Sequence, residues 1–219
     1  MNLFFLDSDL VANARAYSDP HVVKMILEFT QMLYTVLFVL DPERYADLQR
    51  HWEIRAEVAA DEGGKAPKAY RPTHQHHPMV RFAGSSPDAY RFVLDAGLRL
   101  GEEFMRRFRK DCAHACVQHL AALRVFEPRQ WAWPVAEKPQ KRRKVETKPV
   151  VLGAFAWRHW SGEERSFDVP LCMPAEYHDP SAVEAYRAYY QSPEKAAKNR
   201  WRHSEPPAWY QPPEQLSVV

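Results

Sequence analysis

The sequence predicts a mainly α-helical fold: a single-domain helical bundle around one buried central helix, with a small β-hairpin added to it. Three observations lead to this prediction. Residues 18–40 form a long apolar stretch that begins and ends at proline-containing helix signals. The chain of 219 residues holds only 7 glycines against 18 prolines, and the prolines fall between helical stretches. A hydrophobic fraction of 46% supplies enough apolar surface for one core, so we treat residues 1–219 as one domain.

The chain begins with a short apolar segment that ends in two acidic residues. Residues 2–6 are expected to be a strand or an extended segment, and Asp7 and Asp9 lie two positions apart, so their side chains point the same way on an extended chain. The two carboxylates can bind a metal or a cationic group, or they can cap a helix that begins near Leu10. The segment has no basic region before its first acid, so we do not expect a signal peptide.

The central helix carries one narrow polar stripe. Ser18 or Asp19 caps it, Pro20 lies in its first turn, and Asp41-Pro42 ends it. At about 100° per residue, the polar side chains fall within an arc of roughly 80°. They are His21, Lys24, Glu28, Gln31 and Thr35.

This stripe has two interpretations. It can be a buried ion pair of Lys24 with Glu28, or it can line an active-site pocket, because buried polar groups need partners or a wet cavity. Five such groups exceed what one ion pair requires, which favours the pocket. The run is almost long enough to span a membrane, but its charged residues would be costly in lipid, so we expect no membrane partner.

A helix with one exposed side should follow from Asp41-Pro42 to about Ala60, and residues 65–78 then form a loop. His74, His76 and His77 in this loop invite a metal site, although their spacing is not a standard zinc signature. The same loop could bind phosphate, supply a general acid or base, or have no role. Its other polar candidates are Lys68, Tyr70, Arg71 and Thr73.

A third long helix is predicted from Ser85–Asp88 to about residue 126. Gly97 and Gly101 can let another helix approach closely. Cys112, Cys116 and His119 could be metal ligands, but a seam between helices explains them more simply. A cluster of basic residues lies near residue 108. It can form a solvent-exposed charged face, or it can bind the phosphate backbone of a nucleic acid. Its members are Arg106, Arg107, Arg109 and Lys110.

The last third of the chain is predicted to add a basic loop and a hairpin at about 128–170. Residues 138–148 concentrate positive charge and are a second candidate for binding nucleic acid. The residues concerned are Lys141, Arg142, Arg143 and Lys144. Residues 150–165 alternate around a glycine-containing turn, as a hairpin does. Short helices are expected after Asp179-Pro180 and Ser192-Pro193, and Trp201 with residues 206–213 should anchor the C-terminal end.

The overall composition indicates in which cellular compartment the protein works, but it says little about its function. The formal net charge is only +2, so the chain as a whole does not indicate a nucleic-acid partner. Three cysteines argue against a disulfide scaffold and for a reducing compartment. We therefore expect a cytoplasmic protein, in the host cytoplasm if the protein is viral. The oligomeric state stays open.

Three blocks of the sequence resemble one family from tailed phages and large viruses. They are the LDSD motif with the HVVKMILE helix near the N-terminus, the THQHHP loop, and MPAEY with the later AYRAYY. Together they span nearly the whole chain, although the region around 138–165 is longer than the family pattern suggests. The family is associated with the amino-acid:DNA transferases of thymidine hypermodification. The resemblance implies a viral enzyme that transfers an amine or amino acid to an activated 5-hydroxymethylpyrimidine in DNA.

Under this hypothesis the candidate residues divide into three groups. The catalytic candidates are Glu28, His21, His74 and His77. The candidates for binding the small substrate are Asp7, Asp9, Lys24, Gln31, Lys68, Tyr70, Arg71 and Thr73. The two basic clusters would hold the DNA backbone. We expect no cofactor, with a divalent metal left open. Two alternatives stay open: a metal-dependent nuclease, hydrolase or base-excision enzyme, and a non-enzymatic nucleic-acid-binding phage protein.

Overall fold

The computed structural model describes residues 2–62, 67–134, 149–158 and 162–211. Within them it contains eight α-helices and one two-stranded hairpin, and helices make up 55% of the structure, which confirms the mainly α-helical fold class. The elements in chain order are α1 (Leu10–Ala16), α2 (Asp19–Leu40), α3 (Pro42–Asp61), α4 (Pro78–Ala83), α5 (Pro87–Phe108), α6 (Cys116–Val125), β1 (Leu152–Arg158), β2 (Glu164–Pro170), α7 (Ala182–Tyr190) and α8 (Pro193–Ala196).

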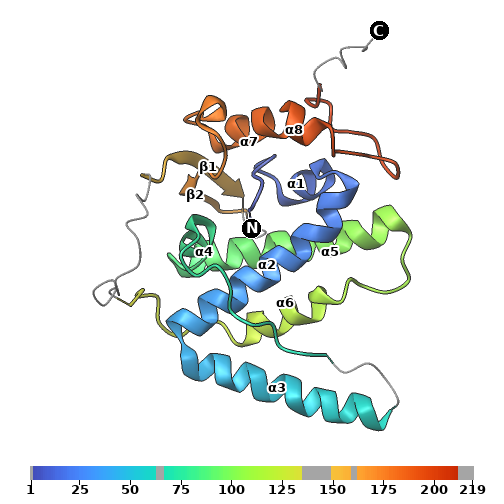
Figure 1. The fold of residues 1–219 in the computed structure, drawn as a ribbon, viewed down its shortest axis with the longest axis vertical. Helices are drawn as coiled ribbons and strands as arrows, with labels where there is room; N and C mark the ends of the chain where they lie inside the picture. The colour runs from blue at the N-terminus through green and yellow to red at the C-terminus, as the bar shows by residue number, and fades with distance from the viewer. Residues whose placement is uncertain (1, 63–66, 135–148, 159–161, 212–219) are drawn as a thin grey trace.

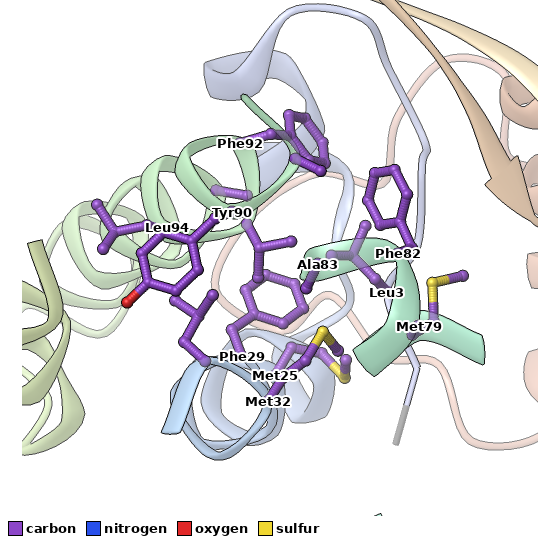
Figure 2. Packing of buried hydrophobic residues seen from close by; sticks show 14 of the residues in the cluster. Leu3, Met25, Phe29, Met32, Met79, Phe82, Ala83, Tyr90, Phe92 and Leu94 are labelled. Carbon is purple, nitrogen blue, oxygen red and sulfur yellow. The ribbon is translucent and has the colours of Figure 1, made fainter. Parts of the chain in front are cut away.

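Helix α2 is the central element, and it packs against α3, α4, α5 and α6 (Figure 1). Its sequence explains its limits: Ser18 is the N-cap, a proline lies in the first turn, and Asp41 ends it while accepting a hydrogen bond from Arg44 N at the start of α3. Figure 2 shows Phe29 between α2 and α5, and Met25 on the side of α2 toward α4. These contacts bury most of the helix in the main hydrophobic cluster.

By length and hydropathy α2 could also cross a membrane, and it is the one helix of the described residues that meets this test. Most of its most apolar stretch, 61%, is buried against the other helices. The buried core helix of a helical protein has this same composition, so the length of α2 follows from its central position.

The N-terminal segment 2–7 is extended and runs through the core, but it belongs to no strand. Because it has no neighbouring strand, side chains must satisfy its backbone. The Tyr17 hydroxyl accepts from Phe4 N (3.1 Å) and donates to Phe4 O (2.9 Å). The Asn13 Oδ1 atom accepts from Leu6 N (2.7 Å) and from Asp7 N (3.1 Å). Asn13 of helix α1 therefore accepts the backbone hydrogen bonds that a neighbouring strand would accept in a sheet.

Replacing Tyr17 by Phe is expected to lower the free energy of unfolding by about 3 kcal/mol. The substitution leaves both backbone groups of Phe4 unpaired in the core, and each buried unpaired group costs about 1–3 kcal/mol. Urea unfolding with an unchanged m-value measures the effect. The control is Tyr177→Phe, a half-exposed tyrosine on the surface. Equal stability of the two variants would contradict this role of Tyr17.

The prediction of one continuous helix to residue 126 is wrong, because α5 ends at Phe108 and α6 begins at Cys116. Arg109 adopts a left-handed conformation (φ 49°) that ends α5, and Lys110 N bonds back to Met105 O (3.1 Å). The chain then turns, and α6 packs along α5. The close approach predicted for Gly101 is confirmed, since a Cβ atom there would lie 2.5 Å from Val117 Cγ2.

The predicted hairpin is confirmed: β1 and β2 are antiparallel, with Phe155 opposite Phe167. Phe155 and Trp157 are buried on the face toward the helices. Helix α7 closes the open side of β1, where Ala154 N bonds to Pro180 O (2.7 Å). The N-cap of α7 is Ser181 rather than Asp179, because the Ser181 hydroxyl accepts from Glu184 N.

Residues 200–211 return to the beginning of α2 and anchor the C-terminal region there. Asp19 N donates to Arg200 O (2.8 Å), and Arg202 N donates to Asp19 Oδ2 (2.7 Å). The rings of Trp201 and Tyr210 lie 4.4 Å apart, and both are packed against the core. The expected aromatic anchors are therefore present, and they bring α8 next to the first turn of α2.

Candidate functional site

The polar stripe of α2 has two ends with different environments. Thr35, at the far end, is fully buried, and its hydroxyl binds the backbone of Thr73 in both directions: it accepts from Thr73 N and donates to Thr73 O, each at 3.0 Å. His21, Glu28 and Gln31 are partly exposed, and Lys24 is exposed. The near end of the stripe is therefore open, while its far end fixes the loop that precedes α4.

Glu28 is the centre of the open end. Its Oε1 atom pairs with Lys24 Nζ (3.1 Å), and its Oε2 atom accepts from Asn2 N (2.9 Å). The Glu28 side chain is only 13% exposed, whereas that of Lys24 is 65% exposed. The predicted ion pair of Lys24 with Glu28 is thus present. It is not an isolated buried pair, because Glu28 also binds the backbone of Asn2. Glu28 also holds the first described residue of the buried N-terminal segment in place.

His21 lies one turn before Lys24 and is held through one ring nitrogen. Its Nδ1 atom lies 2.7 Å from the Tyr190 hydroxyl and 3.1 Å from Ser18 Oγ. The pKa of His21 is lowered to about 4, first by burial and then by the ammonium groups of Lys195 and Lys24, while the Glu28 carboxylate raises it. His21 is therefore uncharged at neutral pH.

The loop 67–77 supplies a second histidine, His77, on which the charge of Glu28 acts. His77 is the N-cap of α4, where its Nδ1 atom accepts from Met79 N (3.2 Å). Burial lowers the pKa of His77, the nearby His74 lowers it too, and the Glu28 carboxylate raises it. His74 itself is exposed and has a positive φ of 55°, a conformation that few residues other than glycine adopt, and its Nδ1 atom lies 2.7 Å from Thr73 Oγ1.

Lys195 completes the group and was not among the residues predicted from the sequence. It comes from α8, and its Nζ atom lies 4.9 Å from the centre of the Tyr189 ring and 5.6 Å from that of Phe4. Burial lowers the pKa of Lys195. The positive charge of Lys24 also lowers it, and the Glu28 carboxylate raises it. We call the five residues His21, Lys24, Glu28, His77 and Lys195 the Glu28 cluster.

The two N-terminal carboxylates are engaged elsewhere. Asp9 caps α1 by accepting from Ala12 N (2.8 Å), and Asp7 pairs with Arg187 (3.2 Å). Both line a surface groove of about 400 Å³ that also includes Glu205. In the described structure neither contacts the Glu28 cluster, so the capping interpretation of Asp9 is confirmed, and binding of a substrate amine by either stays a prediction.

The remaining loop candidates have different positions. Tyr70 is turned toward α6, where its hydroxyl lies 3.2 Å from Cys116 Sγ, and its ring packs against those of Tyr34 and His119. Burial raises the pKa of the Tyr70 hydroxyl above its usual value. Lys68 and Arg71 are exposed on the loop and remain accessible to a ligand.

The predicted cysteine and histidine triad does not form a metal site. Cys112 is exposed and precedes α6, whereas Cys116 is buried. His119 is buried, its Nδ1 atom lies 2.8 Å from the Tyr34 hydroxyl, and its ring stacks 4.1 Å from that of Trp52. Throughout the described ranges, no three metal-ligating side chains gather in one place, and this includes the histidines of the loop 67–77.

The four basic residues near the end of α5 fall into two classes. Arg107 is buried and bound to Glu103 and Asp19, so it is part of the core rather than of a surface. Arg106 pairs with Glu103 but is half-exposed, and Arg109 and Lys110 are exposed. The second basic cluster, Lys141 to Lys144, lies outside the described residues.

Comparisons with protein-family models, with curated proteins and with solved structures found no match to this chain.

Proposed function

We propose that this chain is a viral DNA-base modification enzyme that transfers an amine or amino acid to a phosphate-activated 5-hydroxymethylpyrimidine in DNA. The observation that supports the proposal is the Glu28 cluster. Helix α2, the loop before α4 and helix α8 supply one carboxylate, two histidines with lowered pKa values and two lysines. Lys24 pairs directly with Glu28, and the Glu28 charge acts on the pKa values of His21, His77 and Lys195. Such groupings of perturbed titratable residues are typical of catalytic sites.

The proposed reaction needs the chemical groups of this cluster. The amine nitrogen attacks the 5-methylene carbon, the bond from that carbon to the pyrophosphate oxygen breaks, and pyrophosphate leaves with the bonding electrons. The nitrogen then loses a proton, which an uncharged His21 can accept. Positive charge near the leaving group lowers the barrier, and Lys24 and Lys195 carry it. A phosphate bound between them would raise the pKa of His21 toward the range of an effective base.

Access to DNA requires two further features. A base inside a duplex must leave the stack before its 5-position can be reached, so the enzyme would act on a flipped base or on a single strand. Cations outside the cluster would hold the phosphate backbone. Arg109 and Lys110 at the end of α5, and Lys68 and Arg71 on the loop, are exposed and available for this.

Of the alternatives, the metal-dependent hydrolase has less support. This enzyme would use Asp7 and Asp9 together with Glu28 and the loop that carries His74 and His77. Asp7 already pairs with Arg187 and Asp9 caps α1, and among the described residues no three of such side chains are placed to hold a metal ion. A non-enzymatic binding protein would not need two histidines with lowered pKa values near the largely buried Glu28 carboxylate.

The decisive experiment uses the full chain and DNA that contains pyrophosphate-activated 5-hydroxymethyluracil. After incubation with a panel of amines and amino acids, mass spectrometry of the released nucleosides should detect the mass of one amine adduct. Glu28→Gln should abolish the adduct, whereas the control His51→Asn, on α3 beside Trp52, should retain it. No adduct with any amine of the panel would refute the transferase. DNA binding without an adduct would favour the binding protein.

A further inference from the structure

The hydrogen bonds around His21 define which of its nitrogens carries the proton. Three residues connect to its Nδ1 atom, and we call Ser18, Tyr190 and Asn199 the Tyr190 relay. Ser18 is fully buried, Tyr190 is fully buried, and Asn199 is 5% exposed. They join the first turn of α2 to the end of α7 and the segment after α8, so the relay depends on the complete fold.

The direction of the relay is set at its far end. The Asn199 amide donates from Nδ2 to Tyr190 O (2.9 Å), which leaves its Oδ1 atom facing Ser18 Oγ at 3.0 Å. Because Oδ1 can only accept, the Ser18 hydroxyl must donate to it. The proton of Ser18 is therefore committed, and toward the other members of the relay Ser18 Oγ can only accept.

Ser18 Oγ, the Tyr190 hydroxyl and His21 Nδ1 then form a triangle with edges of 3.1, 2.7 and 3.1 Å. If Nδ1 carries the proton, it donates to the Tyr190 oxygen, which also accepts from Ser18 N (2.8 Å), and Tyr190 donates to Ser18 Oγ. Two of the three edges then hold a proton, and the third places the polarised N–H of Nδ1, rather than a lone pair, beside the Ser18 oxygen. If Nδ1 is bare, the single Tyr190 proton serves one edge. The other two edges then place lone pair against lone pair inside the core, which is costly.

We infer that the Tyr190 relay holds His21 with its proton on Nδ1 and leaves the Nε2 lone pair available as the base. In the part of the chain that the structure describes, Nε2 has no hydrogen-bond partner, and the ring is partly exposed. His77 has the opposite arrangement, because its Nδ1 atom accepts from Met79 N, so its proton lies on Nε2. The cluster thus holds one histidine that accepts a proton at Nε2 and one that donates there.

This assignment makes Tyr190, Ser18 and Asn199 positioning residues, since they act through His21. Its catalytic meaning rests on the proposed function, but the tautomer itself does not. Nuclear magnetic resonance of the full chain with ¹⁵N-labelled histidine reads the tautomer directly, because a bare and a protonated ring nitrogen differ widely in chemical shift. The spectrum of His21→Asn identifies the His21 resonances.

The wild-type spectrum at neutral pH should show His21 with a bare Nε2 and a protonated Nδ1. Ser18→Ala is the main test, since α2 has no side-chain cap bond to lose. It frees the Tyr190 hydroxyl to donate to Nδ1, so it should move the proton to Nε2. Tyr190→Phe should leave the proton on Nδ1, because Ser18 Oγ still accepts from it there. Tyr189→Phe, on the same helix but outside the relay, should also leave the tautomer unchanged.

A wild-type His21 with its proton on Nε2 would overturn the inference. So would a folded Ser18→Ala variant with an unchanged tautomer, or a folded Tyr190→Phe variant with its proton on Nε2. These outcomes are distinct from failure of the proposed function. The expected tautomer without any amine adduct on DNA refutes the transferase alone, and an adduct formed by an enzyme with the other tautomer refutes the relay alone.

Discussion

Replacing Arg107 by Met should lower the free energy of unfolding by about 3–5 kcal/mol, the largest loss of stability that we expect from one substitution. The guanidinium is completely buried and joins the end of α5 to the region between α1 and α2. It donates to the backbone oxygens of Tyr17 (2.6 Å) and Arg15 (2.9 Å), and it pairs with Asp19 (3.2 Å) and Glu103 (2.8 Å). Methionine fills similar volume but leaves these acceptors unpaired in the core.

Arg106→Met is the matched control, since it removes one positive charge from the same turn of α5. Arg106 also binds Glu103, through two bonds of 2.7 Å, but it is 52% exposed, and exposed pairs contribute about 1 kcal/mol or less. Chemical denaturation of both variants provides the comparison. If Arg107→Met proved as stable as Arg106→Met while losing DNA affinity, Arg107 would be a nucleic-acid contact, as the sequence first suggested.

The second large effect concerns catalysis. His21→Asn should lower the rate of adduct formation on activated DNA by about 10²–10⁴-fold, the usual contribution of a general base. The asparagine amide can occupy the position of Nδ1 and keep the bond to Tyr190, but it has no atom at the position of Nε2. The fold should therefore persist while the base is lost. Single-turnover kinetics with nucleoside mass spectrometry would measure the change.

His21→Gln is the complementary variant, because its amide reaches the position of Nε2 and abandons that of Nδ1. It should lose both activity and part of the stability that the Tyr190 contact supplies. Comparable activity of His21→Asn and the wild type would remove His21 from the mechanism.

The sequence predicted local features well, because they depend on neighbours along the chain. Ser18, Asp41 and Ser86 are the N-cap residues of the three long helices, as expected. The side chains of Asp41 and Ser86 accept the cap bonds of α3 and α5, since such a bond requires only a side chain that reaches the next turn. Strict alternation likewise predicted the hairpin, and the i,i+4 spacing of Lys24 and Glu28 predicted their ion pair. The break at Arg109 was missed because no glycine or proline marks it.

Tertiary contacts decided what the sequence could not. Tyr70 and Arg107 lie in polar stretches that read as surface, yet the first turns toward Cys116 and the second is fully buried. Lys195 was missed for the opposite reason. It looked like an ordinary lysine of a short helix, and only the return of the C-terminal segment to Asp19 brings it beside His21.

The extended segment 2–7 has a consequence for the order of folding. Its backbone is held by Tyr17 and Asn13 from nearby, but also by Arg187, whose Nε atom donates to Leu6 O across 181 positions of sequence. Contacts of such separation form late, because a long loop must close first. The segment 2–7 therefore gains its last contact only when α7 has folded against it. Because Lys195 lies on α8, beyond α7, the Glu28 cluster is complete only after that region has folded as well.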